Sequence, residues 1–88
     1  MIDLNHVRIF ERVAARSSFS GAARELGLPR SNVSRAVANL EEALGTRLLH
    51  RTTRKVVLTP AGTALFERAE AIMADLNEPR RDCRRLQL

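Results

Sequence analysis

The chain has 88 residues, which is enough for one small domain with a single hydrophobic core. Its 15 lysine and arginine residues outnumber 10 acidic residues, so the net charge is +5. This charge favours a polyanion such as nucleic acid as the partner, and the alternative is that it only keeps the domain soluble. The single cysteine, Cys83, excludes an intramolecular disulfide and a cysteine-rich zinc cluster. No stretch approaches the ~20 apolar residues of a membrane span, and we expect a cytoplasmic protein with no membrane partner.

The N-terminal segment has the pattern of an amphipathic helix. Asp3 can accept hydrogen bonds from the first free backbone N–H groups, so it predicts a helix start, and the helix should end near residues 16–17. Spacings of three and four residues predict an apolar stripe that faces the core: Leu4, Val7, Phe10, Val13 and Ala14. The positions between them should face water: His6, Arg8, Glu11 and Arg12.

Residues 19–45 are expected to form two helices separated by a turn. Ser18 offers a hydroxyl cap for the first, short helix, and Gly27 can end it in the left-handed conformation. Pro29 suits the first turn of the next helix, whose free N–H groups Ser31 and Asn32 can also cap. That helix should end at Gly45 and bury one stripe: Val33, Ala36, Val37, Leu40 and Leu44. The pattern is typical of a helix-turn-helix.

The other face of the helix over about residues 30–44 is short-chained and polar, and it is basic near its start. Arg35 can reach O6 and N7 of guanine, nearby hydroxyls and amides can bond base edges or phosphates, and Ala38 can meet a thymine methyl. The predicted DNA contacts on this helix are Arg30, Ser31, Asn32, Ser34, Arg35 and Ala38. The alternative is that this face is simply solvated, which the face alone does not exclude.

A small basic hairpin is expected next. Residues 48–49 and 56–58 are short β-prone runs on either side of a polar segment. The segment places three positive charges in one loop, which suits a phosphate backbone or a narrow minor groove. Its predicted DNA contacts are Arg51, Thr52, Arg54 and Lys55. Such a hairpin after a helix-turn-helix is a wing, and it favours the DNA-binding interpretation.

The last segment is predicted to be a dimerising helix. Thr59 and Pro60 place a cap before a first-turn proline. Spacings of four and three then alternate in the heptad seam of a helix that pairs with another: Leu65, Ala69, Ile72, Leu76, Pro79, Cys83 and Leu86. We expect Leu65, Ala69, Ile72 and Leu76 to form a homodimer interface. Pro79 should kink the helix or end it early, leaving residues 80–88 as a basic tail.

The sequence gives little support for an enzyme active site or a metal site. His6 and His50 have no carboxylate or thiol at ligand spacing, and Cys83 lacks a nearby base. Glu41 and Glu42 point about 100° apart on a helix, so they should serve solvation and salt bridges. We therefore expect no catalysis, no cofactor and no metal.

Residues 19–62, with the residue before them, resemble the winged helix-turn-helix domain of LysR-type transcriptional regulators. The shared positions are Ser18-Phe19, Ala22-Ala23, Leu26, Val33-Ser34-Arg35, Leu40-Glu41, Leu44-Gly45, Leu48-Leu49, Arg51-Thr52 and Leu58-Thr59-Pro60-Ala61-Gly62. The resemblance implies a bacterial regulator whose third helix lies in the major groove and whose wing touches flanking backbone. It also implies an effector-binding domain after the dimer helix, absent from this chain, which would bind the small-molecule effector and assemble the tetramer.

The chain departs from the family pattern at the start of the third helix. Family members usually carry Ser-Gln-Pro where this chain has Pro29, Arg30 and Ser31, so the glutamine base contact cannot be carried over. Arg30 would either read a guanine or hold a phosphate. Ser34 and Arg35 match and are carried over as DNA contacts, and the departing positions are where we expect this protein's own sequence preference.

The sequence thus predicts a mainly α fold: a winged helix-turn-helix of three helices and a two-stranded wing over residues 1–59, then a linker and dimerisation helix over 60–88. The predicted function is sequence-specific binding of double-stranded DNA for transcription regulation, by a homodimer on a pseudo-palindromic operator. The alternative is a winged-helix protein-interaction module whose basic face binds an acidic partner without preference among DNA sequences. An RNA binder is disfavoured because exposed aromatic residues for base stacking are lacking.

Overall fold

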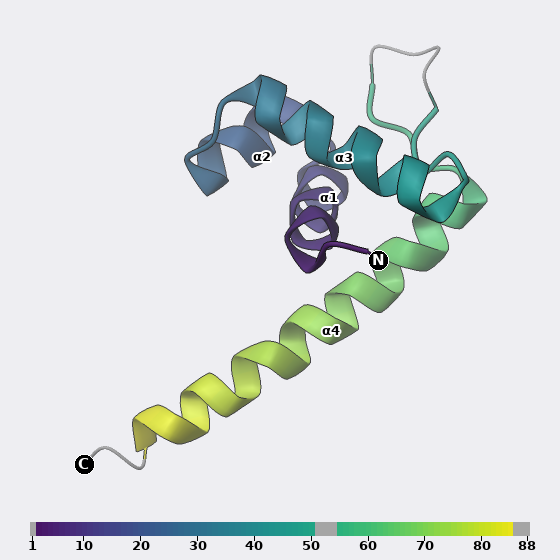
Figure 1. Ribbon diagram of the computed structural model, residues 1–88. Helices are drawn as coiled ribbons and strands as arrows, with labels where there is room; N and C mark the ends of the chain where they lie inside the picture. Colours follow the sequence, from purple (N-terminus) through teal and green to yellow (C-terminus); the bar gives the residue numbers. More distant parts are fainter. Residues whose placement is uncertain (1, 51–54, 86–88) are drawn as a thin grey trace.

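The computed structural model describes residues 2–50 and 55–85, with side chains up to residue 75. Its helices are α1 (Leu4–Arg16), α2 (Phe19–Leu26), α3 (Arg30–Leu44) and α4 (Pro60–Arg85). α1 contacts each of the other three helices, and α3 lies across it, whereas α4 extends away from the group as a long arm (Figure 1). The fold is mainly helical, and each predicted helix is present.

The predicted helix caps at α1 and α2 are confirmed. Asp3 Oδ1 accepts a hydrogen bond of 2.8 Å from the backbone N–H of Asn5, and Ser18 Oγ accepts one of 2.9 Å from that of Gly21. Gly27 ends α2 in the left-handed conformation at a φ of 66°. These bonds satisfy backbone groups that a helix end leaves without an intrahelical partner. The first two helices therefore begin where their local sequence predicts.

The start of α3 differs from the prediction. Pro29 is extended and precedes the helix rather than occupying its first turn, and no side chain caps this end. Instead, the backbone N–H groups of Asn32 and Val33 donate to the carbonyl of Pro29. The side chains of Ser31 and Asn32 are exposed inside the first turn, so they are free to meet an external partner. The helix ends at Gly45 with a φ of 68°, as predicted.

The core lies where α1, α2, α3, the segment after α3 and the first turns of α4 meet. Its largest fully buried side chains are Phe10, Val13, Val33, Val37, Leu40 and Leu48. Each side chain of this size stabilises the fold by about 1.5–3 kcal/mol relative to exposure. The predicted inner stripe of α3 is confirmed, since Val33, Ala36, Val37 and Leu40 are buried and Leu44 is half-buried.

Two residues of α1 lie on the opposite side from the one predicted. Leu4 is 52% exposed, because it is the first residue of the helix and lies outside the core. Glu11 is buried, and its Oε1 accepts a hydrogen bond of 2.8 Å from Arg12 Nη2. The hydrogen bond with Glu11 raises the pKa of the Arg12 guanidinium. The burial of Glu11 is tolerated because a cation accompanies it.

The same arginine joins α1 to α2. Arg12 Nη1 lies 3.1 Å from Glu25 Oε2, and Arg16 pairs with the same carboxylate. The hydrogen bond from Arg16 lowers the pKa of the Glu25 carboxyl. Two basic side chains of the domain are therefore neutralised on the α1–α2 side, away from the outer face of α3.

The last helix continues through Pro79, so of the two predicted outcomes, a kink or an early end, the early end is wrong. A helical proline removes one hydrogen bond from the ladder, and the neighbouring turns carry α4 on to Arg85. The first turns of α4 pack on the domain, with Ala69 buried and Leu65 and Phe66 against the core. Within the described ranges, no helix is long and apolar enough to cross a membrane.

Candidate nucleic-acid interface

The outer face of α3 is exposed as predicted. Arg30, Ser31, Asn32, Arg35 and Ala38 are exposed, and Ser34 is half-buried. Since residues three and four apart share one side of a helix, Ser31, Ser34, Arg35 and Ala38 form a row along it. Their placement fits the predicted DNA contacts. The contacts themselves stay a prediction.

Arg35 has an unused set of hydrogen-bond donors. Its side chain is exposed and forms no hydrogen bond or ion pair with another residue of the described ranges. In contrast, the guanidinium groups of Arg12 and Arg16 both form ion pairs with Glu25. A guanidinium that is left unpaired on an exposed helix face can present two parallel N–H groups to O6 and N7 of guanine without first breaking an internal bond.

Arg30 is held at the junction of α2 and α3. Its guanidinium lies over the ring of Phe19, 5.9 Å from the ring centroid. Contacts of this kind contribute about 0.5–1 kcal/mol at exposed sites. Arg30 is the first residue of α3 and Phe19 the first of α2, so the contact places a positive charge where the two helices begin near each other. This position suits either of the two roles considered for Arg30.

The base of the predicted wing is formed by one antiparallel bridge, between Leu49 and Leu58. The N–H of His50 donates to the carbonyl of Val57 at 2.9 Å, and that of Thr59 donates to Leu48 at 3.0 Å. The described residues show no strand on either side of this bridge, so the structure shows a paired base where the wing was predicted and not the two predicted strands. Arg51, Thr52 and Arg54 lie outside the described residues.

α3 holds the first arm of this base through a buried carboxylate. Glu41 is 7% exposed, and its Oε2 accepts hydrogen bonds from the backbone N–H groups of Leu48 at 2.8 Å and Leu49 at 3.3 Å. The prediction that Glu41 serves solvation is therefore wrong. Its neighbour Glu42 is exposed, as predicted. α3 thus holds the first arm of the wing base directly.

α4 holds the same arm from the other side. Thr59 Oγ1 donates to the carbonyl of Arg47 at 2.6 Å and accepts from the N–H of Gly62 at 3.0 Å, which confirms Thr59 as the predicted cap. A Cβ at Gly62 would lie 2.0 Å from the carbonyl oxygen of Leu48, so only glycine allows this approach. The wing base is consequently clamped between α3 and α4.

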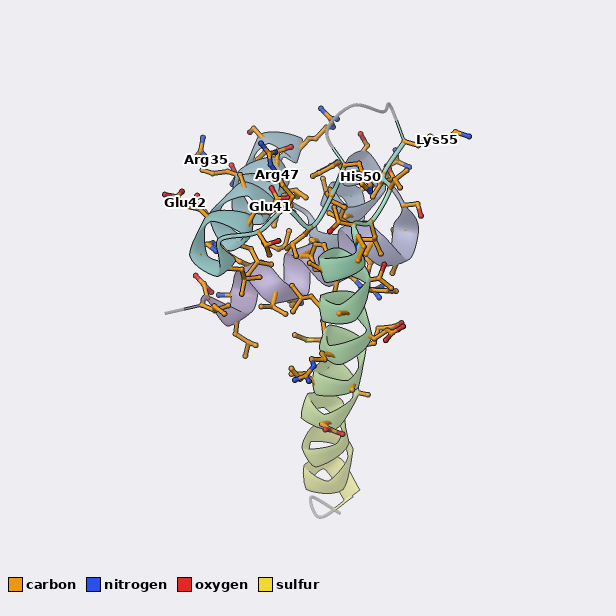
Figure 2. All side chains as sticks on the ribbon, turned by 90° about the vertical axis from the view of Figure 1, so that its right-hand side faces the viewer. Arg35, Glu41, Glu42, Arg47, His50 and Lys55 are labelled. Carbon is orange, nitrogen blue, oxygen red and sulfur yellow. The ribbon has the colours of Figure 1, made fainter. Side chains whose placement is uncertain are left out.

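Four basic or imidazole side chains are spread across the end of the molecule opposite the far end of α4, where the acidic side chain of Glu42 also lies (Figure 2). Arg35 comes from α3, Arg47 and His50 flank the first arm of the wing base, and Lys55 begins the second arm. All four are exposed. Arg47 and His50 were not predicted as contacts, although their position on either side of the apolar pair 48–49 marks them as outward-facing. We call these four residues the basic face.

The predicted dimer seam divides into two parts. Ala69 is fully buried and Leu65 is half-buried against the domain's own core, so Ala69 cannot bury further area against a second copy. Ile72, one turn later, is 43% exposed and remains available. The side chain of Leu76 lies outside the described part of the chain. Heptad spacing alone does not distinguish packing on one's own domain from packing on a partner.

Among the residues that the structure describes, no group of three or more histidine, cysteine or acidic side chains could hold a metal ion. The chemistry available on the basic face is hydrogen bonding and positive charge, displayed by one helix and one hairpin base. This combination suits a phosphate backbone and base edges.

A family model for the lysR family of bacterial regulatory helix-turn-helix proteins matches residues 4–63. The chain belongs to the LysR family. It is a family of DNA-binding transcription regulators, and the match spans α1 to the first turn of α4. The resemblance that the sequence motifs carry is thereby confirmed.

Named relatives of this LysR-family chain are transcriptional regulators. A HTH-type transcriptional regulator of Xanthomonas campestris pv. campestris (strain 8004) is 50% identical over 76 residues, which is 86% of this chain and 22% of the relative. The regulator DmlR of Escherichia coli (strain K12) is 43% identical over 75 residues, which is 85% of this chain and 24% of DmlR. The chain thus spans about a quarter of the length of these two relatives.

Solved LysR-family structures share the fold. The DNA-binding domain of BenM, in complex with catB site 1 DNA, has 33% identity and a TM-score of 0.88, covering 96% of this chain and 93% of that one. OxyR of Corynebacterium glutamicum, as its C206 mutant, has 31% identity and a TM-score of 0.86, covering 96% of this chain and 27% of OxyR. The likeness includes α4 as well as the three-helix part.

Proposed function

We propose that this chain binds double-stranded DNA sequence-specifically as a homodimer and thereby regulates transcription in a bacterial cell. The observation that carries the proposal is the likeness to the BenM domain in its DNA complex, at a TM-score of 0.88 over nearly the whole chain. The exposed outer face of α3 and the basic face beside it supply the groups that such binding needs. A regulator of bacterial DNA acts in the cytoplasm, and this one acts by recognition, without catalysis.

In the proposed complex α3 lies in the major groove. Arg35 donates to a guanine, Ser31, Asn32 and Ser34 bond base edges or phosphates, and Ala38 meets a thymine methyl. The support is that Arg35 is exposed and has no internal partner, and that the row lies on one side of the helix. Arg30, fixed over Phe19, contacts the DNA at the start of the helix.

The wing contacts backbone or minor groove beside the site that α3 reads. Arg51, Thr52, Arg54 and Lys55 are the proposed contacts of the wing, and the basic face adds Arg47 and His50 to Lys55. The clamp of Glu41 and Thr59 on the wing base supports this role, because a phosphate contact needs a fixed position relative to the recognition helix.

Two copies pair through α4, with Ile72 and Leu76 at the interface and with Leu65 and Ala69 holding each helix to its own domain. A two-fold axis would then place two copies of α3 in major grooves one turn, ~34 Å, or a multiple of it apart on a pseudo-palindrome. We assign effector binding and tetramer assembly to the part of the full-length regulators that this chain does not span. The exposed Ile72 on α4 supports this arrangement.

Arg35→Ala should weaken binding to a duplex that the unaltered chain has selected from a random pool by about 1–3 kcal/mol. The loss should be confined to that duplex and should flatten the preference at one base position, because Arg35 is proposed to read a base edge. Fluorescence anisotropy on selected and scrambled duplexes measures both. An equal loss on the two duplexes would show that Arg35 holds a phosphate instead.

A further inference from the structure

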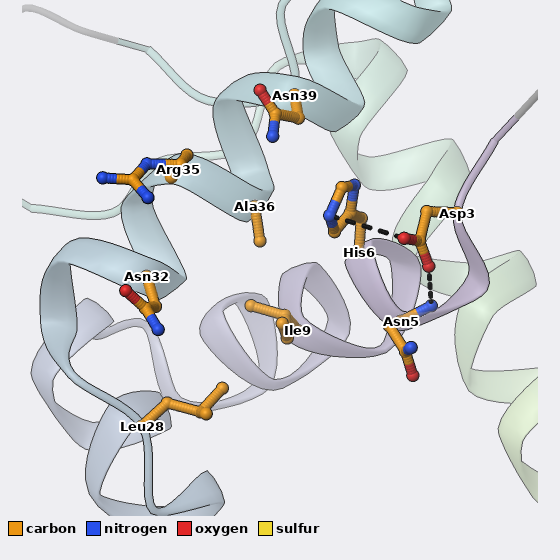
Figure 3. A pocket seen from close by; sticks show the side chains of 9 residues that line it. All are labelled: Asp3, Asn5, His6, Ile9, Leu28, Asn32, Arg35, Ala36 and Asn39. Atoms are coloured by element: carbon orange, nitrogen blue, oxygen red, sulfur yellow. Dashed lines mark hydrogen bonds and ion pairs between the residues drawn. The ribbon is translucent and has the colours of Figure 1, made fainter.

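A groove runs between the first turn of α1 and the side of α3, next to the proposed recognition face (Figure 3). Asn32, Arg35 and Asn39 form the α3 wall, and the residues Asp3, Asn5 and His6 form the opposite wall. The floor between them is largely aliphatic. The proposed function uses two members of the α3 wall, Asn32 and Arg35, and leaves the rest of the groove without a role.

The α3 wall is a ladder of unused donors. Asn32, Arg35 and Asn39 follow at about one helical turn, all three are exposed, and none forms a side-chain hydrogen bond or ion pair with another described residue. Their guanidinium and amide groups can donate to the oxygens of one anion or of neighbouring acceptors. A ligand that fits this wall therefore carries several hydrogen-bond acceptors.

The α1 wall carries one carboxylate, that of Asp3, and both of its oxygens already have partners within the chain. Asp3 Oδ1 accepts from the N–H of Asn5 at 2.8 Å, and Asp3 Oδ2 lies 3.7 Å from His6 Nε2. The N–H groups of His6 and Val7 donate to the Asp3 carbonyl, so the backbone donors of this turn are occupied as well. Binding in the groove therefore depends on side chains, and the Asp3 charge opposes an anion there.

We propose that a DNA backbone phosphate sits in this groove, hydrogen-bonded to the amide of Asn39 with Arg35 and Asn32 beside it, and that Asp3 limits its affinity. The proposal rests on the proposed function. The groove is continuous with the outer face of α3 through Asn32 and Arg35, so the strand that borders the major groove is the nearest source of acceptor oxygens. Phosphate oxygens also form stronger, charge-assisted bonds than a neutral acceptor does.

Two substitutions with opposite expected signs test this groove. Asn39→Ala removes the donor and should weaken binding about fivefold on selected and random duplexes alike, since a phosphate carries no sequence. Asp3→Asn removes the opposing charge and should tighten binding about twofold to fivefold at ~0.1 M salt. Asparagine caps helices as well as aspartate does, so α1 should stay folded, which a circular dichroism melt checks.

Asp75→Asn is the matched control, because it removes the same charge from an exposed position on α4 that does not line the groove. Its effect on affinity should be smaller than that of Asp3→Asn. Unchanged affinity in both groove variants, or equal tightening in both aspartate variants, would overturn the proposal. A loss for Asn39→Ala on the selected duplex alone would mean that Asn39 reads a base. If the unaltered chain binds no duplex, the proposed function fails, and the groove proposal fails with it.

Discussion

Gly62→Ala should destabilise the domain by about 3 kcal/mol or more, although alanine ordinarily favours a helix over glycine by ~1 kcal/mol. The added Cβ would lie 2.0 Å from the carbonyl oxygen of Leu48, which belongs to the backbone and is itself bonded to Thr59. Neither a rotamer change nor a small side-chain movement relieves that overlap. The wing base and the first turn of α4 must separate, and this breaks the clamp that positions the wing.

Gly21→Ala provides the matched control. Gly21 and Gly62 occupy equivalent places, since each donates its N–H to the capping hydroxyl three residues earlier, Ser18 in one helix and Thr59 in the other. A Cβ at Gly21 would meet Ser18 side-chain atoms at 3.3 Å, a contact that small shifts relieve. Its stability should change by less than about 1 kcal/mol.

Thermal unfolding followed by circular dichroism distinguishes the two glycine variants. A loss of 3 kcal/mol lowers the Tm of a domain of this size by roughly 12–24 °C. Similar small changes in Tm for both variants would show that the close approach of Gly62 to Leu48 does not make a side chain at position 62 destabilising.

Glu41→Ala should cost about 2–4 kcal/mol of stability, because it leaves two buried backbone N–H groups, of Leu48 and Leu49, without their acceptor. Glu41→Gln keeps one side-chain oxygen at the same place and should cost less. We also expect Glu41→Ala to weaken the part of DNA affinity that the wing supplies, because the first arm of the wing base is no longer attached to α3.

Glu42→Ala is the control for this pair of predictions. Glu42 neighbours Glu41 in α3, and its side chain is exposed, so removing it should change stability by no more than about 0.5 kcal/mol. Urea denaturation of the three variants gives the comparison. Equal stability of Glu41→Ala and Glu42→Ala would contradict the role of Glu41 as the acceptor that holds the wing base.

Local chemistry made much of this fold predictable. The caps at Asp3, Ser18 and Thr59 and the left-handed stops at Gly27 and Gly45 each depend on a few neighbouring residues, and all five are present. The inner stripe of α3 follows from helical periodicity alone. These features need no knowledge of what lies far along the chain.

Buried acidic residues were not predictable in the same way. Glu11 appeared to lie on the wet side of α1, and its burial depends on Arg12, which α2 also holds through Glu25 thirteen residues later. Glu41 is buried because residues seven and eight positions later return to it. Periodicity assigns a face to a side chain, whereas its partner is set by tertiary packing.

The candidate site was predictable where it lies on one element. Arg35 and its row follow from the spacing within α3 and are exposed. Arg47 and His50 flank the apolar pair 48–49, which marks them as outward-facing but does not place them beside Arg35. The groove with Asn39 and Asp3 arises from the meeting of different segments, so no spacing in the sequence indicates it. Spacing likewise does not indicate what the heptad seam packs against, because Leu65 and Ala69, its first positions, pack on the domain's own core.

Selection of bound duplexes from a random-sequence pool tests most directly that two copies of α3 read DNA around a two-fold axis. The full 88-residue chain is incubated with the pool, and bound duplexes are amplified and sequenced over a few rounds. We predict enrichment of a dyad-symmetric site whose half-sites are one helical turn, about 34 Å, or a multiple of it apart. Salt-sensitive binding with no enriched sequence would contradict the proposed function and would identify the basic face as a general polyanion surface.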